Sequence, residues 1–287
     1  MKKILKIIEK LKLIKHNEGL YILILRVVNF LLKKLKINIY IPTPIEKLKK
    51  NLSKKIISLT KNRVMYGMYK ETYFSEITYW HDYDFSNLFL GCYELQVQNK
   101  ILDVQNKLKL KNIINIGSGI GYHIISLLKK NYFYKGYAFE TNIKGQEIIR
   151  KNAILNNIDD KIKILGEGNF ISIKNNINNS ELSNSLFLID IEGGEFSFFT
   201  KENINFFKDS YFIIEEHDIY DDNKIKNFYN LVNNYFIIEK IKNSSRNPFE
   251  YKILDKFRDD EKFLMMSEGR SESMNWLYLR PKLLTTK

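Results

Sequence analysis

The stretch that decides the fold reads KNIINIGSGIGYHIISLLKK and occupies residues 111–130. A short β-type run ends at Asn115-Ile116, and apolar residues recur at helical spacing from Tyr122 onward. Between them, glycines stand at alternate positions: Gly117, Gly119 and Gly121. Glycine permits a tight turn and close approach of the backbone to a ligand, and a helix that begins there presents unpaired N–H groups. The pattern predicts a strand, a ligand-binding loop and a helix.

Short apolar runs alternate with helical patterns from this loop to the end of the chain, which is typical of βαβ units around a parallel sheet. The last two of the expected strands have no long helix between them and are expected to form an antiparallel pair that closes the sheet. The seven expected strands occupy residues 112–116, 134–139, 162–165, 185–191, 210–215, 235–242 and 274–279. Residues 111–287 are therefore interpreted as one α/β domain.

Two acidic residues follow the second and third expected strands. Glu140 lies where a carboxylate can accept hydrogen bonds from two ribose hydroxyls, although an acid that only begins the next helix is the alternative. Glu167, in the run GEGN, is expected to meet an adenine amino group. A glycine loop followed by an acid suits nicotinamide and flavin as well, so this arrangement alone does not select the cofactor.

The run LIDIEGGEFSFF at residues 188–199 resembles the strand-four motif of the FkbM-type methyltransferases, an Asp-x-Glu-Gly-x-Glu pattern after an apolar strand. Asp190, Glu192, Gly193 and Glu195 match it. Four further runs are similar to a subgroup of that family: VMYGMYK (64–70), LGCYELQVQNKI (90–101), IIEEHD (213–218) and EGRSESMNWLYLRP (268–281). The resemblance covers residues 63–281.

The resemblance implies a Rossmann-like class I methyltransferase fold, with a seven-stranded, mostly parallel sheet and an antiparallel last strand. It also implies S-adenosylmethionine as cofactor and O-methylation of a small molecule or glycan. Many methyltransferases have an acid where this chain has Asn115, and Glu94 is expected to supply that carboxylate. The expected cofactor-binding residues are Glu94, Asn115, Gly117, Ser118, Gly119, Gly121, Glu140, Glu167 and Asp190.

Catalytic groups are expected at the carboxyl ends of the strands, where open α/β sheets bind ligands. Asp190, Glu192, Glu216, His217 and Asp218 fall there. The prediction for catalysis is Asp190, Glu192 and His217, one of which removes a proton from the acceptor. The same groups could hold a divalent metal, which is not predicted. The structural alternatives are a turn whose acids cap the next helix and a solvent histidine.

Charge is concentrated at the beginning of the chain. Residues 1–62 carry a net charge of +13 and residues 63–287 are balanced, so the catalytic part lacks the basic surface that a nucleic acid requires. Apolar residues at helical spacing predict amphipathic helices at 2–36, broken near 17–19, and at 45–59, separated by Ile41-Pro42-Thr43-Pro44. This extension is expected to cap the domain, to self-associate or to lie on a membrane surface.

The chain offers little sign of secretion or membrane insertion. Cys92 is the single cysteine, and the apolar run at 20–32 is shorter than the ~20 residues that span a bilayer. We therefore expect a cytoplasmic protein, either free or in peripheral contact with the inner face of the membrane.

Residues 63–110 are rich in aromatic side chains and are interpreted as lid or linker helices. His123 is expected to pack or to lie beside the cofactor. The aromatic residues are Tyr66, Tyr69, Tyr73, Tyr79, Trp80, Tyr83 and Phe85. Two other functions stay open at this point: a non-catalytic cofactor-binding or assembly module, and a nicotinamide-dependent oxidoreductase.

Overall fold

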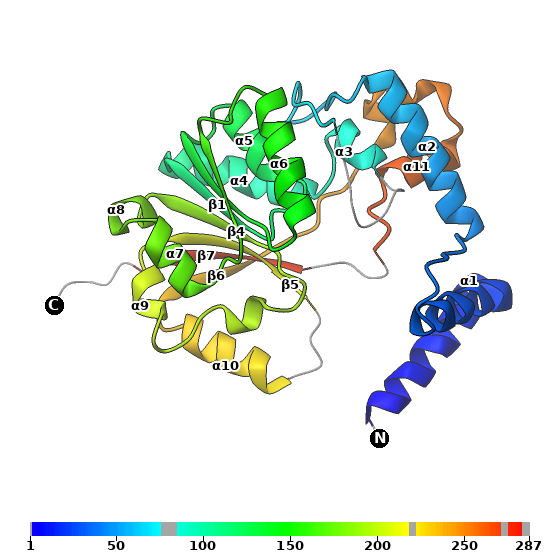
Figure 1. Ribbon diagram of the computed structural model, residues 1–287, viewed down its shortest axis with the longest axis horizontal. Coiled ribbons are helices and arrows are strands. Elements are labelled where there is room, and N and C mark those ends of the chain that lie inside the picture. Colours follow the sequence, from blue (N-terminus) through cyan, green and yellow to red (C-terminus); the bar gives the residue numbers. More distant parts are fainter. Residues whose placement is uncertain (1, 76–84, 218–221, 271–274, 283–287) are drawn as a thin grey trace.

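The computed structural model describes residues 2–75, 85–217, 222–270 and 275–282 (Figure 1). Four residues named above lie outside this part of the chain: Tyr79, Trp80, Tyr83 and Asp218. Residues 271–274, which belong to the run EGRSESMNWLYLRP and to the start of the last expected strand, lie outside it as well.

The strands form one seven-stranded sheet in the order β3-β2-β1-β4-β5-β7-β6. β7 runs antiparallel to both of its neighbours, β5 and β6, and the other neighbouring pairs are parallel. The strands are β1 (Asn112–Ile116), β2 (Lys135–Phe139), β3 (Ile162–Leu165), β4 (Ser185–Ile189), β5 (Tyr211–Glu216), β6 (Phe236–Ile241) and β7 (Asn275–Pro281). This is the Rossmann-like class I methyltransferase fold, and the expected fold class is confirmed.

The fourth strand ends two residues earlier than expected. Residues 185–191 were predicted as strand, but β4 ends at Ile189. The amide of Ile191 donates to the Glu195 carboxylate at 2.7 Å instead of continuing the ladder. The amide of Asp190 still donates to the carbonyl of Ile116 at 3.0 Å, and the chain leaves the sheet after it.

Both faces of the sheet are covered by helices, because alternate side chains of the buried strands point to opposite sides. Ile113, Leu186 and Leu188 join a core with α4, α5 and α6, whereas Ile114 and Phe187 join a second core with α7, α8, α9 and α10 (Figure 1). These helices are α4 (Leu95–Leu108), α5 (Tyr122–Lys129), α6 (Ile143–Leu155), α7 (Phe170–Asn176), α8 (Asn179–Leu182), α9 (Ile204–Phe207) and α10 (Asp222–Val232).

The N-terminal extension divides into two parts. α1 (Lys2–Lys34) is interrupted by Gly19 in a non-helical conformation, as the sequence predicted, and α2 (Pro44–Thr60) begins with a capping box from Thr43. α2 packs with α3 (Ser86–Leu90) and α11 (Asp259–Met266), and its Leu52 and Ile56 are buried in the core. Figure 1 shows α1 beyond α2, away from the sheet. No helix in the described ranges is long and apolar enough to cross a membrane.

Candidate functional site

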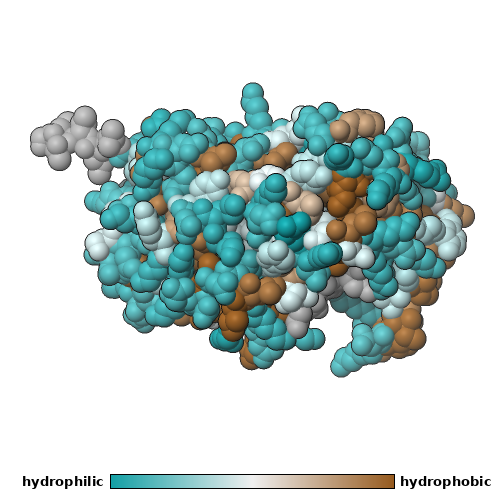
Figure 2. All heavy atoms as spheres, turned by 90° about the horizontal axis from the view of Figure 1, so that it is seen from above, coloured by the Kyte–Doolittle hydropathy of each residue, from teal (hydrophilic) through white to brown (hydrophobic). Residues whose placement is uncertain are grey.

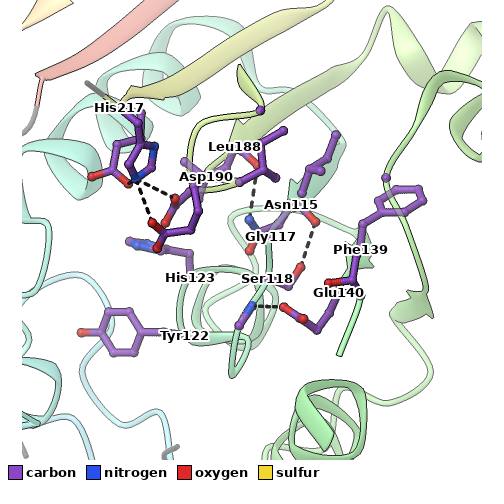
Figure 3. A pocket seen from close by; sticks show the side chains of 18 of the residues that line it. Asn115, Gly117, Ser118, Tyr122, His123, Phe139, Glu140, Leu188, Asp190 and His217 are labelled. Carbon is purple, nitrogen blue, oxygen red and sulfur yellow. Dashed lines mark hydrogen bonds and ion pairs between the residues drawn. The ribbon is translucent and has the colours of Figure 1, made fainter. Parts of the chain in front are cut away.

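A cavity of about 1280 Å³ opens at the carboxyl ends of β1, β2, β4 and β5. This edge is where an open parallel sheet binds its ligands. All the predicted site residues line it except Gly121, which is the N-cap of α5. Figure 3 shows two groups: Phe139 and Glu140 lie on one side of the glycine loop, and Asp190 and His217 on the other.

The glycine loop is fixed by close contact with the end of β4. Gly117 has φ +79°, and a Cβ at this position would lie 1.6 Å from the backbone oxygen of Asp190. Gly121 has φ +80°, and its Cβ would lie 2.6 Å from the Cδ1 of Ile125. L-residues rarely adopt such φ values, so both positions need glycine for conformation, and Gly117 needs it for space as well because the atom it would meet belongs to the backbone.

The loop amides are engaged inside the protein. Those of Gly117 and Ser118 donate to the carbonyl of Phe139 at 3.0 Å, and that of Gly119 donates to Glu140 Oε2 at 2.8 Å. The loop therefore binds β1 to the end of β2. This differs from the interpretation that these amides are open to a ligand, because the end of β2 lies within their reach.

Asn115 holds the other side of the loop. Its side-chain Nδ2 donates to the backbone carbonyl of Leu188 at 3.2 Å, and its backbone carbonyl accepts from Ser118 Oγ at 2.8 Å. The side chain is buried and joins β1 to β4. The amide of Asn115 therefore holds the two strands together, at the position where many methyltransferases have an acidic residue.

Glu140 presents a fixed carboxylate to the cavity. Its Oε2 accepts from the amide of Gly119 and its Oε1 from the amide of Asn142, both at 2.8 Å. Each oxygen keeps capacity for a further hydrogen bond. Glu167 is exposed at the cavity edge, where its Oε2 accepts from Asn169 Nδ2 at 3.0 Å. Glu140 is thus rigidly placed, and Glu167 is not.

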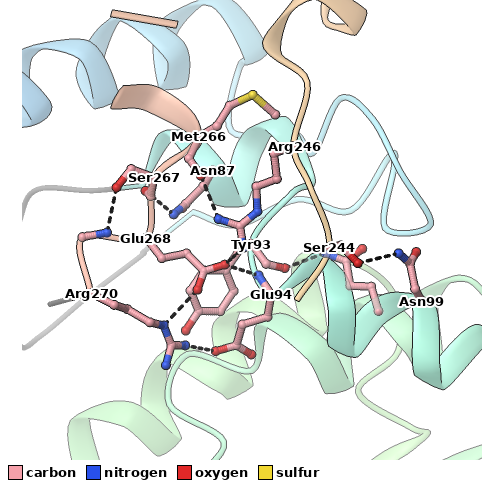
Figure 4. Close-up of polar contacts among 12 residues, drawn as sticks. Asn87, Tyr93, Glu94, Asn99, Ser244, Arg246, Met266, Ser267, Glu268 and Arg270 are labelled. Atoms are coloured by element: carbon pink, nitrogen blue, oxygen red, sulfur yellow. Dashed lines mark hydrogen bonds and ion pairs between the residues drawn. The ribbon is translucent and has the colours of Figure 1, made fainter. Parts of the chain in front are cut away.

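Glu94 lies at the centre of a buried network (Figure 4). Its Oε1 accepts from Arg270 and its Oε2 is 2.8 Å from His123 Nε2. The Nδ1 of His123 is in turn 2.8 Å from the hydroxyl of Tyr69. Burial alone would raise the pKa of Glu94, but the hydrogen bond with His123 and the charge of Arg270 lower it. The carboxylate is therefore held ionised.

Arg270 is the cation that the sequence interpretation missed. It contacts three carboxylates, those of Glu94, Glu215 and Glu268, and Glu268 also accepts from the amide of Glu94 at 2.8 Å. Burial opposes the charge of Arg270, but these carboxylates raise its pKa above the usual value. Arg270 belongs to the run EGRSES, which was among the quoted motifs and could have drawn attention to it. The run does not show which carboxylates Arg270 contacts.

His217 faces a second group of acids. Its Nδ1 is 2.9 Å from Glu195 Oε1, and its Nε2 is 3.5 Å from both Glu192 Oε2 and Glu215 Oε2 and 3.7 Å from Asp190 Oδ1. The hydrogen bond with Glu195 outweighs partial burial and raises the pKa of His217. The sequence placed His217 with Asp190 and Glu192, and the structure brings the three together.

Glu195 orients this histidine. Burial alone would raise its pKa, but hydrogen bonds from His217 and the backbone lower it, so the carboxylate is an acceptor. Its two oxygens also accept from the amides of Ile191 and Gly193, at 2.7 and 2.9 Å. The proton of the pair therefore lies on His217 Nδ1, and Nε2 is left to face the cavity. The alternative was that these acids cap the next helix, but Glu195 instead accepts from the amides of the turn that precedes it.

The acids beside His217 repel one another. Burial, followed by the charges of Glu215 and Glu94, raises the pKa of Asp190 well above its ordinary value. Burial and the charge of Glu94 likewise raise the pKa of Glu215. Asp190 Oδ1 is buried and has no hydrogen-bond partner among the described residues. This end of the cavity is thus short of positive charge.

Ligand atoms of Asp190, Glu192 and His217 lie within 4.8 Å of one another, close enough to hold a divalent cation. Ligand atoms of Glu94, Asp190 and Glu215 also lie within 4.8 Å of one another. An imidazole oriented by a carboxylate, as His217 is by Glu195, suits metal ligation as well as proton transfer.

Of the described aromatic residues that the sequence singled out before the core, Phe85 is the one that lines the cavity. Tyr69 is fully buried and Tyr66 stacks edge-on against Tyr251 at 4.8 Å, so both belong to the packing beneath it. Tyr93 and Tyr122 do line the cavity, with ring centroids 5.6 Å apart. The aromatic wall of the site thus comes partly from residues that were not predicted for it.

No protein-family model and no curated protein matches the chain. Among solved structures, a putative O-methyltransferase from Klebsiella pneumoniae is similar over 90% of this chain and 97% of its own, at 11% identity and a TM-score of 0.45. An O-methyltransferase from Bacillus cereus, in complex with SAH, is similar over 88% and 97%, at 12% identity and a TM-score of 0.44. These similarities place the chain in no family, and the FkbM-type membership stays a prediction.

Proposed function

We propose that the chain is an S-adenosylmethionine-dependent methyltransferase that methylates a hydroxyl of a small molecule or glycan. The observation that carries the proposal is the charge of the cavity. Seven carboxylate side chains line it, against Arg270 and two histidines: Glu94, Glu140, Glu167, Asp190, Glu192, Glu215 and Glu268. S-adenosylmethionine carries an ammonium and a sulfonium group, and both are stabilised by such surroundings.

The residues fit this cofactor. Glu140, fixed by two backbone amides, is placed to accept from ribose hydroxyls, and Glu167 stands further along the cavity edge for the adenine end. Glu94 and Asp190 lie at the opposite end, where Asp190 Oδ1 is buried without a partner. A cationic ligand group would complete that end. Glu94 thus supplies the acid that Asn115 does not.

A dinucleotide suits the cavity poorly. Its pyrophosphate is anionic and is repelled by the carboxylates of the cavity, while the amides of Gly117, Ser118 and Gly119 are engaged and Arg270 is paired with three carboxylates. The charge of the cavity therefore favours a sulfonium cofactor over NAD or NADP.

For catalysis, the cofactor supplies an electrophilic methyl group. His217 accepts the proton of the acceptor hydroxyl at Nε2, while Glu195 holds the ring and stabilises the imidazolium that forms. Asp190 and Glu192 line the same end of the cavity and orient the acceptor. Methyl transfer depends mostly on alignment, which these anchored groups provide.

The test is transfer of a labelled methyl group from S-adenosylmethionine to a panel of glycans and small hydroxyl compounds. Transfer that falls in Asp190→Asn and Glu192→Gln supports the proposal. A second candidate function is favoured if the protein binds S-adenosylmethionine but transfers no methyl group to any compound of the panel. The same holds if Asp190→Asn and Glu192→Gln leave a residual rate of methyl transfer unchanged. That candidate is a non-catalytic cofactor-binding or assembly module. It is favoured by Asn115, which stands where many methyltransferases have an acidic residue.

Glu140→Gln should weaken binding of S-adenosylmethionine by roughly 10- to 100-fold, because charge-assisted hydrogen bonds contribute about 1.5–3 kcal/mol. The amide also loses one of the acceptors that now hold Gly119 and Asn142. Calorimetric titration measures the change. Glu167→Gln is the matched control, and its exposed side chain should give a smaller loss. An equal or larger loss in the control would contradict the ribose assignment.

Glu195→Gln should move the acid limb of the kcat–pH profile to lower pH. His217 acts as a base only when unprotonated, so its raised pKa places the loss of activity at higher pH than for an ordinary histidine. Removing the Glu195 charge removes the main cause of that rise. Glu192→Gln, whose side chain is 88% exposed, should shift the limb less. If the acid limb of Glu195→Gln stays at the same pH as in the native protein, or moves to higher pH, His217 is not the titrating base.

A further inference from the structure

The first helix of the chain leaves its apolar side chains uncovered. None of the side chains described between residues 8 and 41 is buried, whereas α2 buries Leu52 and Ile56 in the core. A helix as apolar as the second half of α1 is normally covered by protein or by lipid. Something outside the described chain therefore has to cover it.

The uncovered side chains form one stripe along α1. They follow one another at spacings of four, three, four and four residues, which places them on one face of a helix. The members are Leu20, Ile24, Val27, Leu31 and Leu35, each between 41% and 69% exposed. Tyr21 and Phe30, 63% and 57% exposed, lie beside them. Apolar atoms also gather at the right-hand end of Figure 2, the end at which Figure 1 places α1 and α2.

The opposite face of this helix, called the polar face below, carries polar side chains on either side of Ile22, and these side chains already have partners. The Asn29 side chain binds both the amide and the carbonyl of Ile41 at 2.8 Å, and Arg26 pairs with Glu18 at 2.6 Å. Helical spacing puts Lys33 on this side as well. The segment after α1 is thus held on the polar face, and the apolar stripe is left for a partner.

The charge of this part of the chain identifies the partner. Residues 1–41 carry a net charge of +8, whereas residues 63–287 carry none. A second copy of α1 would bring two such charges together, which opposes self-association. An anionic bilayer surface accepts apolar side chains and attracts lysines within a Debye length of about 10 Å. We propose that α1 lies in the surface of an anionic lipid bilayer, with the stripe from Leu20 to Leu35 inserted.

The test is co-sedimentation of the full-length protein with vesicles made of equal parts phosphatidylcholine and phosphatidylglycerol. The native chain should pellet with these vesicles and not with pure phosphatidylcholine. Lys33→Glu/Lys34→Glu/Lys36→Glu should lower the partition coefficient by at least about 100-fold, because each lysine near the surface contributes about a fivefold factor. Ile24→Asp/Leu31→Asp should lower it by roughly 100-fold through lost apolar burial.

The matched control makes the same charge change on the balanced part of the chain. Lys109→Glu/Lys163→Glu/Lys226→Glu replaces three exposed lysines there and should pellet like the native chain. Binding of S-adenosylmethionine, measured in parallel, checks that every variant is folded and separates this proposal from the enzymatic one. The proposal is overturned if the native chain stays in the supernatant, or if the control falls as far as the α1 variants. It is also overturned if light scattering shows a dimer that Ile24→Asp/Leu31→Asp dissociates without any vesicle binding.

Discussion

Gly117→Ala should abolish measurable binding of S-adenosylmethionine and destabilise the fold by about 2–5 kcal/mol. The new Cβ would lie 1.6 Å from the backbone oxygen of Asp190, so the ends of β1 and β4 must move apart. The residue would also keep a φ near +79°, which costs an L-residue about 1–2 kcal/mol. Both effects act on the loop that joins the two ends of the cavity.

Urea unfolding and calorimetric titration measure the two consequences separately. Gly166→Ala is the matched control, because it also lies at the cavity edge and its Cβ would meet nothing within 4 Å. Its free energy of unfolding should change by less than about 0.5 kcal/mol. Native stability and affinity in Gly117→Ala would show that the close approach to Asp190 is not required.

His217→Ala should lower kcat by about 100- to 10,000-fold, the range typical for loss of a general base, while affinity for S-adenosylmethionine changes little. Its Nε2 faces the acceptor end of the cavity, and the glycine loop and Glu140 lie on the other side (Figure 3). A fall in kcat with unchanged cofactor affinity is therefore the expected signature. Single-turnover methyl transfer and calorimetry measure the two quantities.

His16→Ala, an exposed histidine of α1, is the control and should behave like the native chain. A further control treats the native enzyme with EDTA. If EDTA removes activity, a divalent cation restores it and His217→Ala no longer binds that cation, the cluster of Asp190, Glu192 and His217 ligates a metal, and the assignment of His217 as the base is wrong. Activity that EDTA leaves unchanged, together with the loss in His217→Ala, supports proton transfer by His217.

Much of the fold could be predicted from the sequence, because it depends on local patterns. The boundaries of β1 and β3 agree with the expected residues, and the last strand is antiparallel as expected. The reason given for that strand was incomplete, because α11 does lie between β6 and β7 and has the same eight residues as α5. The end of β4 could not be predicted, since it depends on the Glu195 carboxylate binding the amide of Ile191. The sequence does carry a local sign of the turn, since Asp190 interrupts the apolar run and two glycines follow at 193 and 194. It does not give the residue at which the strand ends.

The candidate site was predicted where its residues belong to motifs and was missed where they meet through tertiary packing. Arg270 and Glu94 are 176 positions apart, and neither run reveals that they form an ion pair. The pairing of His217 with Glu195 spans 22 positions and joins two turns. The pattern also could not show that the amides of the glycine loop are used within the protein.

The same limit applies to the N-terminal extension. Helical periodicity predicted both helices and the break at Gly19, but it did not distinguish a helix that caps the domain from one that stays uncovered. α2 buries Leu52 and Ile56, whereas the side chains described in α1 are not buried. The difference depends on which surfaces the rest of the chain offers, and short-range pattern does not contain that information.

The central claim is that the carboxylate-lined cavity binds a sulfonium cofactor. Calorimetric titration of the native protein with S-adenosylmethionine, S-adenosylhomocysteine, NAD and NADP tests it most directly. The account predicts one site for each of the first two ligands, weakened in Glu140→Gln, and no heat of binding with NAD or NADP. Binding of a dinucleotide, or no binding of S-adenosylmethionine by the folded protein, would contradict it.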